Sequence, residues 1–69
     1  MNKYRLLNDG GFTLGENITF PVVVTGQVSS GGTIIRVPCE EMHRIGADKQ
    51  YDPCQGYYNF ILGSEAELV

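Results

Sequence analysis

The chain has 69 residues, the length of one domain spanning 1–69, and a domain of this size has a thin hydrophobic core. Eight acidic against five basic side chains give a net charge of −3, and the basic residues form no run. Nucleic acids and anionic membranes are bound mainly by clustered cations, so this composition argues against both kinds of ligand. The thin core argues equally against a deep catalytic cleft.

The first residues of the chain predict two short strands around a turn. Over 3–8, apolar and polar residues alternate, which indicates a strand with Tyr4 and Leu6 facing the core. The segment 8–11 reads Asn-Asp-Gly-Gly, and these residue types favour the backbone angles of a tight hairpin turn. A second, shorter strand is predicted to return over 12–14.

The clearest strand pattern runs over 18–25, where apolar residues recur at alternate positions. Because Pro21 has no amide hydrogen to donate, we expect this strand to lie at an edge of the sheet or to contain a bulge. The glycine- and serine-rich segment 26–32 predicts a flexible turn. The chain then returns over 33–37 as a strand with Ile35 inward.

One short helix is predicted over 38–46. Pro38 suits the first helical position and Gly46 suits the residue after the helix end. On such a helix Met42 would face the core. The following segment, 47–56, is predicted to be a polar loop.

Two strands are predicted after the loop, over 57–62 with Tyr58 inward and over 65–69 with Ala66 and Leu68 inward. Consecutive short strands in so few residues must curl to bury their apolar faces. The predicted fold class is therefore mostly β with one short helix. Its architecture is a small SH3-like barrel or a strongly curled antiparallel sheet of five to six strands.

Three residues near the helix contain metal-ligating atoms, namely Cys39, His43 and Cys54. Structural zinc takes four ligands, so a zinc-stabilised module using these three is the weaker alternative, and no metal or cofactor is predicted. A disulfide between the cysteines and a Cys39–His43 nucleophile–base pair are further alternatives. Catalysis by such a pair needs an orienting third group and a cleft, so no catalytic residue is predicted and the chain is not expected to be an enzyme.

No apolar run approaches the ~20 residues of a membrane span, and the first residues do not resemble a signal peptide. We therefore expect a cytoplasmic location without membrane binding, where the cysteines would be free thiols. Exposed aromatic side chains rimmed by carboxylates are typical of protein-binding surfaces. The residues predicted to form such a surface are Phe12, Tyr51, Tyr57, Asp9, Asp48 and Asp52.

These observations favour a non-enzymatic protein-binding module that contacts a larger protein. An inhibitor or accessory factor of the type that phages and plasmids encode fits the length and the acidic charge. The alternatives are the zinc module, a small barrel that binds nucleic acid on its sheet, and isolated aromatic residues that form no patch. A symmetric homodimer through the predicted edge strand at Pro21 is a further option.

Overall fold

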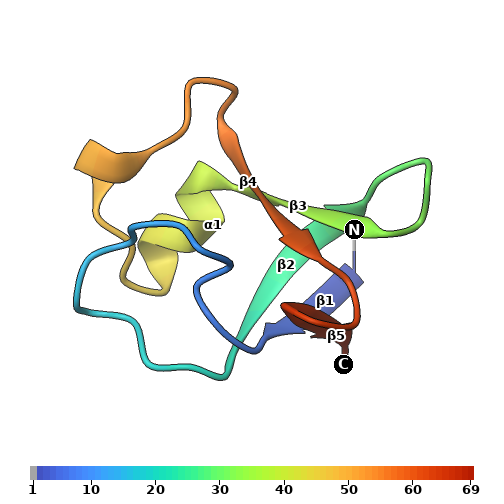
Figure 1. Ribbon diagram of the computed structural model, residues 1–69. Coiled ribbons are helices and arrows are strands. Elements are labelled where there is room, and N and C mark those ends of the chain that lie inside the picture. Colours follow the sequence, from blue (N-terminus) through green and yellow to red (C-terminus); the bar gives the residue numbers. More distant parts are fainter. Residues whose placement is uncertain (1) are drawn as a thin grey trace.

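Five strands form one antiparallel sheet in the computed structural model, which describes residues 2–69 (Figure 1). Two short helices lie between the third and the fourth strand. The predicted mostly β fold with one short α-helix is therefore confirmed. The elements in chain order are β1 (Asn2–Leu6), β2 (Val22–Val28), β3 (Ile34–Pro38), α1 (Cys39–Arg44), the 3-10 helix η1 (Lys49–Tyr51), β4 (Tyr57–Ile61) and β5 (Ala66–Leu68).

The strands lie in the order β4-β3-β2-β1-β5, so β1 to β4 form a meander and β5 returns to pair with β1. A bridge between Leu62 and Ala66 brings the end of β4 to the start of β5. Figure 1 shows the two strands meeting there. The sheet is thus curled into a half-barrel of five strands, as the strand pattern predicts.

The core consists of the inward side chains of the sheet and the buried side of α1. Side chains alternate between the two faces of a strand, so every second residue of β3 and β4 is buried, as are Tyr4 and Leu6 of β1. Burying one large apolar side chain contributes about 1.5–3 kcal/mol, so these residues supply most of the stabilisation. The largest fully buried side chains are Tyr58, Phe60, Leu6, Ile35, Met42, Val24 and Val37.

The predicted strand over 12–14 is wrong. The turn before it is closed by a hydrogen bond from the amide of Phe12 to the carbonyl of Asp9, but it does not lead into a second strand. The side chains of Asn8 and Asp9 accept hydrogen bonds from the backbone of the two glycines that follow, and the chain continues as a long irregular segment, 7–21. Leu14 of this segment is buried, and its carbonyl accepts a hydrogen bond from the backbone of Asp48 instead of a neighbouring strand.

The predicted strand over 18–25 is confirmed only over 22–25, and its expected place at an edge of the sheet is wrong. β2 begins directly after Pro21, since the ladder with β1 starts at the pair of Leu6 and Val22. The residue without an amide hydrogen is thereby kept outside the ladder, and β2 lies in the middle of the sheet between β1 and β3. The homodimer contact predicted at this strand stays a prediction.

The edges of the sheet are β4 and β5. One of the two side chains of β5 that the sequence pattern places inward is exposed. Ala66 is fully buried as predicted, but Leu68 is 64% exposed and lies outside the core. β5 has only three residues and ends at the rim of the half-barrel, where no other described element covers Leu68.

The helix α1 is shorter than predicted and ends in a hydrogen-bonded cap. Pro38 is the residue before the first helical turn, and Met42 is fully buried as expected. At the other end, the amide of Gly46 donates to the carbonyl of His43, and the amide of Ala47 donates to the carbonyl of Met42. This pattern is a Schellman motif, which requires a residue with positive φ, and Gly46 has φ of 117°. No helix among residues 2–69 has the length and apolar character that crossing a membrane requires.

Gly46 also has no room for a side chain, because a Cβ atom there would lie 2.7 Å from the carbonyl oxygen of Asn17. We expect Gly46→Ala to lower the free energy of unfolding by about 2–4 kcal/mol in urea titrations. Gly32 is the matched control, since its φ is also positive but no atom lies near its Cβ position. Equal losses of stability in Gly46→Ala and Gly32→Ala would contradict this explanation.

Candidate functional site

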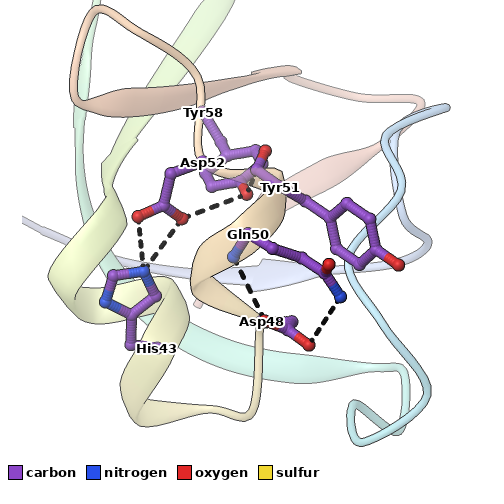
Figure 2. A network of polar contacts seen from close by, with 6 residues as sticks. All are labelled: His43, Asp48, Gln50, Tyr51, Asp52 and Tyr58. Carbon is purple, nitrogen blue, oxygen red and sulfur yellow. Dashed lines mark hydrogen bonds and ion pairs between the residues drawn. The ribbon is translucent and has the colours of Figure 1, made fainter.

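Three of the predicted partner-binding residues come together in the turn after α1, at residues 48–52, which we name the Tyr51 turn (Figure 2). Asp48 caps η1: one carboxylate oxygen accepts from the Gln50 amide at 3.1 Å, and the other accepts from the Gln50 side chain at 3.1 Å. The amide of Tyr51 donates to the carbonyl of Asp48. The turn is thus folded by its own polar groups.

Asp52 joins the end of this turn to α1. Both of its carboxylate oxygens lie within hydrogen-bond distance of Nε2 of His43, at 2.8 and 2.7 Å, as Figure 2 shows. A carboxylate only accepts hydrogen bonds, so Nε2 is the ring nitrogen that carries the hydrogen. Both side chains are about three-quarters buried, which shields the pair from solvent.

Tyr58 of β4 connects the turn to the sheet. Its side chain is fully buried, and its hydroxyl donates to the carbonyl of Tyr51 at 3.1 Å and lies 3.4 Å from the carboxylate of Asp52. Burial raises the pKa of Tyr58 to about 12, helped by the negative charge of Asp52, by the charge interaction with Cys39 and by the hydrogen bond to Asp52. The phenol therefore stays neutral and keeps donating.

Cys39 is the first residue of α1, and its side chain is buried near Asp52. Burial, the charge of Asp52 and a hydrogen bond to it raise the pKa of the Cys39 thiol. A nucleophilic cysteine needs a lowered pKa and a free base, but here the pKa is raised and Nε2 of His43 is turned to Asp52. The arrangement therefore favours a structural thiol.

The residues of the zinc and disulfide alternatives are not assembled. Cys54 is exposed whereas Cys39 is buried, and both are free thiols. Across residues 2–69, no group of three or more His, Cys, Asp or Glu side chains is arranged to hold a metal ion. Cys39 and His43 instead belong to the polar cluster around Asp52.

The other three predicted partner-binding residues lie elsewhere. Phe12 is half-buried, with its ring packed edge-on against Tyr58 and Phe60 at centroid distances of 5.1 and 5.8 Å. Tyr57 lies on the outer face of β4, with the guanidinium of Arg36 5.1 Å from its ring centre. Asp9 lies in the turn that follows β1. These three residues lie outside the Tyr51 turn.

Sequence reasoning missed the supports of the Tyr51 turn. The sequence suggests His43 as a metal ligand or as the base of a Cys39–His43 pair, and Tyr58 as a core residue. The partners of His43 and Tyr58 are in the loop that the pattern left unstructured, and no periodicity relates them. The one available signal is Asp48 two residues before Gln50, a spacing typical of an aspartate that caps its own turn.

Comparisons of the chain with protein-family models, with curated proteins and with solved structures find no match.

The raised pKa of Tyr58 predicts an alkaline loss of stability. The neutral phenol is favoured in the folded state, so its stabilisation is fully present below pH 10 and is lost as the pH rises from 10 through about 12. We expect Tyr58→Phe to reduce the drop in unfolding free energy over this interval by on the order of 2 kcal/mol. Urea titrations at a series of pH values measure it, with Tyr51→Phe as the control for losing an exposed phenol. An unchanged drop in Tyr58→Phe would contradict the assignment.

Proposed function

We propose that the chain is a non-enzymatic protein-binding module that contacts a larger protein through the Tyr51 turn. The observation that carries this proposal is the contrast between the two parts of Tyr51. Its side chain is 40% exposed, while its carbonyl is held by the buried hydroxyl of Tyr58 and its neighbour Asp52 is held by His43. An aromatic side chain is offered to solvent on a backbone that is fixed.

This arrangement supports binding for an energetic reason. Ordering a flexible loop on binding costs free energy, and a loop that is already fixed avoids most of that cost. Tyrosine adds a large rigid surface and a hydroxyl, which is why it is enriched among the residues that dominate binding energy. The exposed carboxylate of Asp48 lies in the same turn. A partner surface with an apolar hollow and a neighbouring cation would complement it.

The chemistry of the polar cluster supports a non-enzymatic role. The Cys39 thiol is buried with a raised pKa, and the imidazole of His43 is engaged by Asp52. Both groups are better suited to fixing the turn than to reacting with a substrate. A cytoplasmic inhibitor or accessory factor, of the type that phages and plasmids encode, remains our proposal for the biological role. We also infer an SH3-like arrangement for the half-barrel, from the five short curled strands alone, and draw no function from it.

The proposal is tested by affinity capture from a lysate of the source cells, quantified by mass spectrometry. We expect Tyr51→Ala to reduce recovery of the captured partner by at least about tenfold while the circular dichroism spectrum stays unchanged, because a central tyrosine typically contributes 2 kcal/mol or more. Ile61→Ala is the matched control, since Ile61 is exposed on β4 and lies outside the turn. Equal recovery with Tyr51→Ala and the unsubstituted chain would contradict the assignment of the turn.

A further inference from the structure

A second surface lies on the outer face of the sheet, where part of β2 has no strand on one side. β2 pairs with β1 from Val22 to Gly26, but β3 pairs only with Gln27 and Val28. The backbone beside α1 is completed by side chains instead. The amide of Thr25 donates to the Glu41 carboxylate at 2.7 Å, and Arg44 donates to the carbonyl of Val23 at 3.3 Å.

The carboxylate of Glu41 is bound by the hydrogen-bond donors beside the unpaired part of β2. It accepts the Thr25 amide and two hydrogen bonds from the guanidinium of Arg44, at 2.8 and 2.7 Å. These hydrogen bonds lower the pKa of Glu41, so the group is ionised. A backbone amide and a planar guanidinium are the donors that carboxylates prefer. One acidic side chain of the chain itself already occupies part of the surface.

A groove continues from this point in both directions. One hollow of about 370 Å³ is lined by Lys3, Val23, Thr25 and Arg44 among others, and a second of about 250 Å³ shares Thr25 and Arg44 with it and reaches Pro38. A third, of about 240 Å³, extends from Pro38 over the Arg36–Tyr57 stack. Neighbouring hollows share lining residues, and we name the three together the outer groove. Its residues used below are Lys3, Val23, Thr25, Arg36, Pro38 and Arg44.

The charges of the molecule are divided between two sides. Four of the five cationic side chains lie on the outer face of the sheet or on α1 beside it, and Lys49 is the exception. Among residues 2–69, Lys3 and Arg36 have no carboxylate partner, whereas Arg5 and Arg44 are paired with Glu67 and Glu41. Five acidic residues lie in turns and loops away from this face, namely Asp9, Glu16, Asp48, Asp52 and Glu65. The other three acidic residues, Glu40, Glu41 and Glu67, lie beside these cations, and Glu40 and Glu41 line the groove. Among the described residues the outer groove thus carries two unpaired cations, Lys3 and Arg36, and one unpaired carboxylate, Glu40.

We propose that the outer groove binds an acidic, extended peptide segment of a partner protein. Lys3 and the unbonded side of the Arg44 guanidinium receive a second carboxylate next to the one that Glu41 provides. Val23, which is 40% exposed, and Pro38 give the segment an apolar floor between its charged residues. Arg36 receives a further carboxylate at the far end of the groove.

The same features make a nucleic acid a poorer occupant. Affinity for nucleic acids comes from many phosphate contacts and from bases stacked on free aromatic rings. The outer groove has two unpaired cations, and the ring of its tyrosine, Tyr57, is already covered by Arg36. This binding site is independent of the Tyr51 turn, so either proposal can fail without the other.

The test uses a defined probe, a fluorescein-labelled peptide of alternating Glu and Val about eight residues long, which spans about 26 Å when extended. Fluorescence anisotropy of the full chain at low salt should show saturable binding. We expect Lys3→Glu and Arg36→Glu each to weaken binding by at least about tenfold, through loss of a cation and gain of repulsion. Lys49→Glu is the matched control, because it changes the same charge outside the groove and should leave binding unchanged.

Control peptides, control variants and NMR titrations decide the outcome. The Lys–Val peptide of equal length should not bind, and amide chemical shifts in NMR titrations should move at Lys3 and Thr25 when the Glu–Val peptide is added. Absence of saturable Glu–Val binding, equal binding of the Lys–Val peptide, or an equal effect of Lys49→Glu would overturn the proposal. Tighter binding of a thymidine oligonucleotide than of the Glu–Val peptide would replace it with a nucleic-acid site. Lys3→Gln, which removes the charge without reversing it, confirms the effect if Lys3→Glu alters the fold.

Discussion

The buried hydroxyl of Tyr58 imposes the constraint on which the rest of this structure depends. A buried hydroxyl without a partner costs roughly 1–3 kcal/mol, a large share of the stability of a small domain. Because the side chain has no exposed surface, the partner must come from the protein, and the 47–56 segment supplies it through the carbonyl of Tyr51. The pairing of Asp52 with His43 then connects the same segment to α1. One buried polar atom thus gives an otherwise irregular loop a defined shape.

This constraint also separates the two sides of the molecule. The connections carry most of the unpaired carboxylates and the exposed Tyr51. The sheet carries Lys3 and Arg36 on its outer face, and Glu41 and Arg44 of α1 complete the backbone of β2 where a strand is missing. The helix therefore packs its Met42 into the core and uses its polar side chains to complete the sheet. A small domain obtains two chemically different surfaces in this way.

Local patterns predicted the parts of the fold that depend on local physics. Alternation placed Tyr4, Leu6, Ile35 and Tyr58 inward correctly, and Gly46 was identified as the end of the helix. The errors arose where long-range packing decides. Phe12 lies in a segment with the pattern of a short strand, but its side chain packs on Tyr58. Pro21 directly precedes β2, so its missing amide hydrogen does not force β2 to an edge of the sheet. Leu68 has the spacing of a core residue but lies at the rim. The pairing of His43 with Asp52 joins a helix to a loop nine residues later, and no sequence period encodes it.

We expect the polar network to hold the Tyr51 turn as rigidly as the sheet. Backbone order parameters from NMR amide relaxation measure this directly. We expect values of about 0.85 for residues 48–52, equal to those of β3 and β4. In Asp52→Asn the values should fall within the turn alone, because the Asn side chain has one oxygen that can accept from His43 where the carboxylate has two. Values below about 0.6 in the unsubstituted chain would show a flexible loop and would contradict the account.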